Sequence, residues 1–167
     1  MRAVWGEETF LHPGEFHFCS APGRIGTLLG SCVAVTVWHP TRHFGGMCHI
    51  LLPARLRPAS APPDGRFADE AVEMFGHELK SRHVGPADCQ VKLFGGGNMF
   101  SGTRAANLDI GRRNIEATRH ALRDHGFSVL TEHVGGTAHR RLYFDLASGH
   151  VWLSLPERPA TKIKDLM

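Results

Sequence analysis

The chain has 167 residues, of which 42% are hydrophobic and 21% are charged, and its formal net charge is +3. This size and composition are typical of one ordinary globular domain, so we expect residues 1–167 to form a single domain with its core over about 12–155. The mild charge and the scattered basic residues argue against nucleic acid or a membrane surface as a partner. No stretch reaches the roughly 18–20 apolar residues of a membrane span.

The N-terminal segment and the cysteines indicate a compartment. Residues 1–8 lack the long apolar core of a signal peptide, so we expect a cytoplasmic protein. No two cysteines show C-x-x-C spacing, which argues against a compact zinc site, and a reducing cytosol would keep them as free thiols. The cysteines are Cys19, Cys32, Cys48 and Cys89. We therefore expect no metal.

Two short strands are expected after an irregular start. Residues 1–13 show no periodicity and end in a Pro-Gly break. Residues 15–19 alternate polar and aromatic side chains, which predicts a half-buried strand with Phe16 and Phe18 facing inward. A second short strand is predicted at 25–29, after the next Pro-Gly pair.

The centre of the chain is a pair of apolar, β-branched runs, residues 27–38 and 45–53, which predict a hairpin. If it closes symmetrically about Pro40-Thr41, the numbers of paired residues sum to 81. Cys32 then lies opposite His49, in a pair whose Cβ atoms are roughly 4.5–5.5 Å apart. A thiol and an imidazole at that distance could share a proton, which makes both residues candidates for catalysis.

The Gly30-Ser31 pair breaks the first run just before Cys32. Such a break exposes backbone N–H groups beside the candidate nucleophile, where they could bind a developing oxyanion. A free thiol with a pKa of about 8.5 is mostly protonated at neutral pH, and a neighbouring imidazole can lower that pKa. Thiolate and imidazolium together suit acyl transfer. A lone Cys or His is more often structural. The hypothesis of catalysis therefore depends on the spacing of Cys32 and His49 and on the Gly30-Ser31 break.

The remaining residues predict two helices and further strands. Residues 54–65 are rich in Pro, Ala and Arg and predict a mobile surface loop near the site. A helix is predicted at 67–83, and a second one at 110–125 with Asp109 as its cap. The Gly-rich segment 95–97 favours close backbone packing over a phosphate cradle. The other predicted elements are strands at 89–94 and 127–134, a last hairpin at 141–145 and 150–155, and a loosely held tail at 156–167.

Short connections between seven or eight expected strands do not fit alternating β-α-β units. The fold class that these elements predict is α/β: a layered single domain with a mixed, largely antiparallel sheet or sheets and two main helices.

Several motifs resemble one known family. The segments Leu28–Val35 and Gly45–Pro53 closely resemble those of the CheD chemoreceptor glutamine deamidases. Leu93–Phe100 resembles that family's Gly-Gly loop, and Ile110–Asn114 resembles the start of its second helix. The resemblance extends over roughly residues 12–155.

The resemblance implies a cytoplasmic hydrolase that converts particular glutamines of chemotaxis receptors to glutamate. Cys32 matches the nucleophile and His49 the base, and the family's third residue is a threonine shortly before the Gly-Ser-Cys turn, where Thr27 is the only threonine. The reaction would pass through a thioester, with N–H groups near Gly30 and Ser31 at the oxyanion, and it requires no metal or organic cofactor.

Receptor glutamines lie on long helices, so the thiol must open onto a groove. The loops at 54–65 and 95–107 are the expected walls of that groove. Two alternatives remain. The resemblance also implies binding of the CheC phosphatase, so the protein could be a non-catalytic regulatory module; it could also be a cysteine amidase or peptidase with another substrate.

Overall fold

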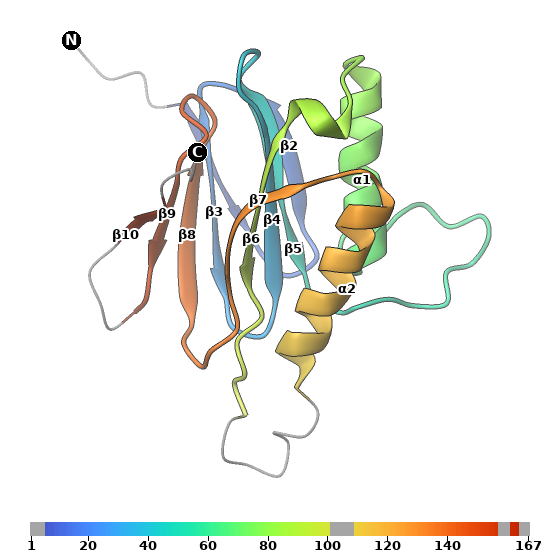
Figure 1. Cartoon of the computed structure of the whole chain (residues 1–167), viewed down its shortest axis with the longest axis vertical. Coiled ribbons are helices and arrows are strands. Elements are labelled where there is room, and N and C mark those ends of the chain that lie inside the picture. Colours follow the sequence, from blue (N-terminus) through green and yellow to red (C-terminus); the bar gives the residue numbers. More distant parts are fainter. Residues whose placement is uncertain (1–5, 101–108, 157–160, 164–167) are drawn as a thin grey trace.

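Ten strands and two α-helices are present in the residues that the computed structural model describes, 6–100, 109–156 and 161–163 (Figure 1). The helices are α1 (Ala68–Ser81) and α2 (Ile110–Asp124), and a short 3-10 helix spans Pro86–Asp88. The strands are β1 (Glu7–Leu11), β2 (Phe16–Ser20), β3 (Gly23–Leu29), β4 (Val33–His39), β5 (Phe44–Ile50), β6 (Gln90–Gly95), β7 (Val129–Val134), β8 (Arg140–Asp145), β9 (Val151–Ser154) and β10 (Thr161–Ile163).

The strands form two five-stranded sheets. One sheet has the order β1-β3-β8-β9-β10 and the other has the order β2-β5-β4-β6-β7. The pairs β1–β3 and β6–β7 are parallel, and the other neighbouring pairs are antiparallel. The α/β fold class with mixed, largely antiparallel sheets and two helices is confirmed.

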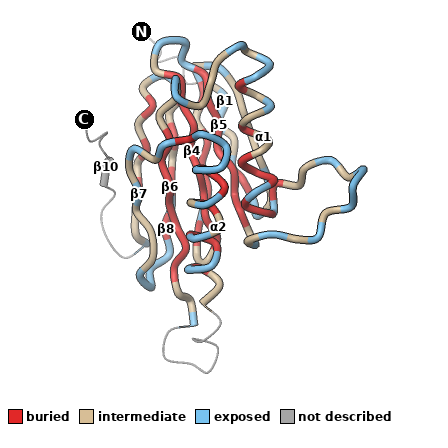
Figure 2. The backbone as a smooth tube through the Cα atoms, turned by 45° about the vertical axis from the view of Figure 1, so that its right-hand side comes forward, coloured by how far each residue is buried: buried red, intermediate tan, exposed pale blue. Residues whose placement is uncertain are grey.

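Three layers follow from the alternation of side chains along the strands. On β4, Val33, Val35 and Val37 face the helices, where they pack with the apolar stripes of α1 and α2. Ala34 and Trp38 face the opposite way, into a second core shared with β3 and β8 of the other sheet. Both helices therefore cover one sheet, whose central strands are buried along their whole length (Figure 2).

The predicted strand at 27–38 is in fact two strands in different sheets. The first ends at Leu29 and the second begins at Val33, so the Gly30-Ser31-Cys32 turn carries the chain from one sheet to the other. The break that the Gly-Ser pair predicted is confirmed.

The predicted register of the hairpin is wrong by two residues. Val33 pairs with Ile50, and Ala34, not Cys32, lies opposite His49. The cause is a four-residue turn, Pro40–His43, in which His43 adopts a positive φ of 50°. Because side chains alternate with a period of two, a two-residue shift leaves every side chain on its predicted face.

Both ends of the chain contain more structure than the sequence predicted. The segment at 1–13 was expected to be irregular, yet β1 lies within it and pairs with β3 in parallel. In the expected loose tail, residues 161–163 pair with β9. β1 pairs in parallel with a strand further along the chain, and β10 has only three residues, so neither leaves a periodic pattern from which a strand could be predicted.

Most of the other predicted elements are confirmed. The strand at 16–20 places Phe16 and Phe18 against the core, and Asp109 accepts a hydrogen bond from Arg112 N at the start of α2. Residues 101–108, part of one expected groove wall, lie outside the described residues. The loop at 54–65 projects from the body in Figure 2 but is tied to α1 by ion pairs from Arg55 and Arg57.

Candidate active site

A threonine from one sheet and a histidine from the other meet in the core between the sheets. Thr27 on β3 and His49 on β5 are buried, and the Thr27 Oγ1–His49 Nδ1 distance is 2.7 Å. The Thr27 hydroxyl donates to the carbonyl oxygen of Leu11 at 2.8 Å. Since its one hydrogen is used there, Thr27 must accept from Nδ1–H of His49. The imidazole is therefore the tautomer with a lone pair on Nε2.

The lone pair of His49 is available at neutral pH. Burial lowers the pKa of the imidazole from 6.5 to about 4, so the ring is neutral. Its Nε2 atom is buried and, among the described residues, has no hydrogen-bond partner. A neutral imidazole with a fixed tautomer and an unused lone pair can act as a general base.

Cys32 lies in the same core layer as this imidazole. It belongs to the cluster between the sheets, with Met47 and Ala34, and its exposed fraction is 9%. Ala34 is opposite His49, so Cys32 is a diagonal neighbour of His49, a relation that typically spans about 7–8 Å. The thiol and the imidazole thus share a face of the sheet, as predicted, without a hydrogen bond between them.

The expected lowering of the thiol pKa is wrong. Burial raises the pKa of Cys32, which leaves the sulfur protonated in the resting protein. The neighbouring imidazole does not offset this effect because it is itself uncharged. If Cys32 is the nucleophile, its thiolate must therefore form by proton transfer when substrate arrives.

The turn before β4 is held by its carbonyl groups. Gly97 N donates to Gly30 O, Gly96 N donates to Cys32 O, and Asn114 Nδ2 donates to Ser31 O. The turn is therefore fixed through its oxygens, and the oxyanion site at Gly30 and Ser31 stays a prediction.

The glycines after β6 allow this close approach. A Cβ atom on Gly95 would lie 2.3 Å from Cys32 O, and Gly95 has a positive φ of 104°. A Cβ atom on Gly96 would lie 2.3 Å from the Ile115 side chain. The interpretation of the Gly-rich segment as close backbone packing is therefore confirmed.

Two contributors to the site were not predicted from the sequence. The carbonyl of Leu11 comes from β1, which no local pattern revealed. Asn114, fully buried on α2, donates through Nδ2 to Ser31 O and to Leu51 O, each at 3.1 Å. A buried polar residue within an apolar helix stripe is a usable signal for such a role.

Cys48 is adjacent to His49 in sequence but belongs to the other core. Its side chain packs on the helix side of the sheet, and burial raises its pKa to about 12. It provides a matched control for Cys32. Across the described ranges, no group of three or more His, Cys, Asp or Glu side chains could hold a metal ion.

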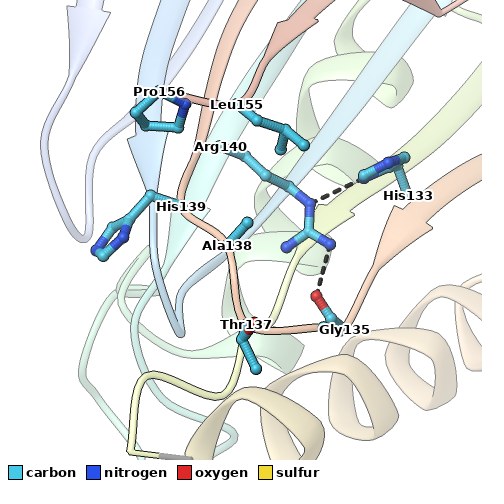
Figure 3. A pocket seen from close by; sticks show the side chains of 9 residues that line it. His133, Gly135, Thr137, Ala138, His139, Arg140, Leu155 and Pro156 are labelled. Carbon is cyan, nitrogen blue, oxygen red and sulfur yellow. Dashed lines mark hydrogen bonds between the residues drawn. The ribbon is translucent and has the colours of Figure 1, made fainter. Parts of the chain in front are cut away.

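A cavity of about 520 Å³ opens beside the Gly30 turn. It is lined by His133, Gly135, Gly136, Thr137, Ala138, His139, Arg140, Leu155 and Pro156 (Figure 3). A Cβ atom on Gly30 would lie 3.4 Å from His139 Nε2, which places the cavity next to the nucleophile turn.

Comparison with known proteins identifies the family. A family model described as CheD, chemotactic sensory transduction, matches residues 51–155. A Dechloromonas aromatica protein named "Probable chemoreceptor glutamine deamidase CheD 3" is 46% identical over 158 residues, which is 95% of this chain and 93% of that protein. The chain belongs to the CheD family.

Other CheD proteins are similar in sequence over a comparable share of the chain. One from Pseudomonas syringae pv. tomato is 44% identical and covers 91% of both chains. One from Leptospira interrogans is 36% identical over 90% of this chain and 93% of its own length. The CheD model match begins after His49 and so does not include Thr27, Cys32 or His49. None of the described helices is long and apolar enough to cross a membrane.

Proposed function

We propose that this CheD protein hydrolyses the side-chain amide of specific glutamines in methyl-accepting chemotaxis receptors, yielding glutamate and ammonia. Cys32 is the nucleophile, His49 the general base and acid, and Thr27 the residue that positions His49. The observation that carries this proposal is the unused lone pair of His49 Nε2 in the core layer that also contains Cys32. The substrate helices are cytoplasmic, so the enzyme acts in the cytoplasm.

In the first half of the reaction, the glutamine Cδ approaches the sulfur of Cys32. His49 Nε2 accepts the thiol proton as Sγ bonds to Cδ, and the N–H groups of the Gly30-Ser31-Cys32 turn stabilise the oxyanion. The imidazolium then donates its proton to the amide nitrogen. The C–N bond breaks, ammonia leaves, and a thioester remains.

In the second half, water replaces ammonia. His49 Nε2 accepts a proton from the water, whose oxygen attacks the thioester carbon. The C–S bond breaks, and the thiolate recovers a proton from His49 as glutamate leaves. Thr27 holds the ring through Nδ1–H in both halves, so Nε2 remains the nitrogen that exchanges the proton. The protein's own residues supply every proton transfer.

Mass spectrometry of a receptor cytoplasmic fragment tests the proposal. We expect the wild type to raise the mass of specific glutamines by the amide-to-acid difference, and Cys32→Ala to leave them unchanged. Cys48→Ala, a change of the same kind next to His49 but in the other core, should retain activity. Conversion by both wild type and Cys32→Ala, or by neither, would overturn the enzyme assignment.

The same proteins separate the two alternatives. A regulatory module would bind the CheC phosphatase and convert no glutamine, so a pull-down with CheC that survives Cys32→Ala would show binding independent of catalysis. An amidase or peptidase with another substrate would show rapid, His49-dependent alkylation of Cys32 and yet leave receptor glutamines intact.

A further inference from the structure

One arginine beside the nucleophile turn is buried with an unused donor. Arg140 on β8 is 3% exposed and pairs across the ladder with Leu29, the last residue before the turn. Its Nε donates to His133 Nδ1 at 2.9 Å and its Nη2 to Gly135 O at 2.6 Å. Its Nη1 is buried and has no hydrogen-bond partner within the described ranges (Figure 3).

The charge of Arg140 also has no counter-charge in the described part of the chain. No ion pair there includes Arg140, and its two acceptors, an imidazole nitrogen and a carbonyl oxygen, are neutral. Burial lowers the pKa of the guanidinium. A buried, unpaired charge destabilises the fold, and an anionic ligand would remove part of that penalty.

The cavity lined by Arg140 has room for such a ligand. Its volume of about 520 Å³ exceeds that of a single side-chain carboxylate, and one wall is the exposed turn at 136–139. Gly135 and Gly136 have positive φ angles of 79° and 69°, and nothing lies within 4 Å of a Cβ atom on either. The turn therefore has free space into which it can shift to admit a group to Nη1.

We propose that this cavity binds the carboxylate of an acidic residue on the receptor helix, close to the glutamine being deamidated, with Arg140 Nη1 as a donor. The inference rests on the proposed function and adds a source of substrate selectivity to it. On a helix, side chains three or four positions apart are about 5–6 Å from each other. An acidic residue so placed can reach the cavity beside the turn while the glutamine reaches Cys32.

The substrate provides the first test. In a receptor fragment that the wild type deamidates, the Asp and Glu residues within one helical turn of the target glutamine are changed to Ala. Alanine is used because glutamine would create a new target. We expect kcat/KM of the wild type to fall by at least about tenfold, mostly through KM. An unchanged kcat/KM would overturn the inference.

The enzyme provides the second test. With Arg140→Gln, folded by circular dichroism, the intact and the alanine-substituted fragments should react at similar, low kcat/KM. Arg141→Gln, a control on the exposed face of the same strand, should keep the wild-type preference. If Arg140→Gln prefers the intact fragment over the alanine-substituted one as strongly as the wild type does, the inference is overturned. If that variant does not fold, the substrate series with wild type decides. Failure of wild type to deamidate the intact fragment is a different result and would overturn the proposed function itself.

Discussion

The hydroxyl of Thr27 decides which nitrogen of His49 carries the proton and which is free to accept one. It donates to Leu11 O and accepts from Nδ1–H, so a residue without a hydroxyl leaves the ring free to rotate or to exchange tautomers. We expect Thr27→Val, which keeps the shape, to lower kcat by about 10- to 100-fold, and Thr27→Ser to restore most of it. The measurement is steady-state deamidation of a receptor fragment.

Thr36 on β4 is the control for this prediction. Thr36 is buried in the sheet that contains His49 but is not hydrogen-bonded to His49. We therefore expect Thr36→Val to keep kcat near that of the wild type. Equal losses in Thr27→Val and Thr36→Val would indicate a general packing effect and contradict a role for the hydroxyl.

Asn114 joins the two catalytic segments through one amide group. Its Nδ2 bonds to Ser31 O next to Cys32 and to Leu51 O shortly after His49. Asn114→Asp is nearly isosteric but replaces that donor with an acceptor, so two carbonyls lose their partner. We expect kcat to fall by roughly tenfold or more with little change in KM, because the donor holds the thiol relative to the imidazole without touching substrate.

Alkylation of Cys32 separates positioning from loss of fold in this variant. The labelling rate in unfolded protein should be equal for wild type and Asn114→Asp, while in folded protein the His49-dependent part of the rate should be reduced in the variant. The Asn98→Asp change, at a half-buried position outside α2 where the side chain already acts as an acceptor for Phe100 N, serves as the control. A lower kcat with an unchanged labelling profile would contradict the assignment.

At the scale of elements, local pattern was sufficient for the helices and most strands but not for the sheet register. The stripe from Ala68 to Leu79 identified α1 because a period of 3.6 is visible within one segment. The register of β4 and β5 depended on the conformation of His43, which hydrophobic pattern does not encode. Cys32 and His49 still share a face of the sheet because a two-residue error preserves the face.

The loop at 54–65 is better anchored than its composition predicted. Glu70 on α1 is 2% exposed and accepts from Arg55 Nε and Nη2, at 3.0 and 2.9 Å, and from Asp64 N at 3.1 Å. Arg55 lowers the pKa of Glu70, which therefore stays charged. One buried carboxylate thus fixes both ends of the loop to the helix.

We expect Glu70→Gln to release this loop. The amide cannot accept both Arg55 bonds, and losing charge-assisted hydrogen bonds costs about 2 kcal/mol. Trypsin should then cut after Arg55 several-fold faster, because cleavage follows the population of the open loop. The Arg57–Pro58 bond is resistant to trypsin, so Arg55 is the site to follow. Glu73→Gln, which removes a half-exposed partner of Arg57, should change the rate little. Mass spectrometry follows the cleavage rate. Equal rates of cleavage in Glu70→Gln and Glu73→Gln would contradict the anchoring role of Glu70.

At the scale of the whole molecule, the site exists because two sheets pack face to face. Thr27 and the carbonyl of Leu11 come from one sheet, whereas His49 and the strand after Cys32 come from the other. The sequence placed Cys32 and His49 together because they are near in the chain. It could not derive the packing of β3 on β5 or the parallel β1, since neither contact is local, and the resemblance alone pointed to Thr27.

Burying a neutral imidazole between the sheets also ties stability to pH. The folded-state pKa of His49 is about 4, below its ordinary value of 6.5. Above pH 6.5 the ring is neutral in both states. As the pH falls from 6.5 towards 4, only the unfolded chain takes up the proton, so the free energy of unfolding decreases. The full loss is on the order of 3 kcal/mol.

Denaturant unfolding at several pH values measures this loss. His49→Gln lacks the titrating ring, so its free energy of unfolding should decrease less steeply between pH 6.5 and pH 4, whatever its value at neutral pH. His77→Gln, at an exposed position on α1, should follow the wild-type slope. Parallel profiles for wild type and His49→Gln would mean that the ring binds a proton equally well in the folded and unfolded protein. The buried, neutral base that the reaction requires would then not exist.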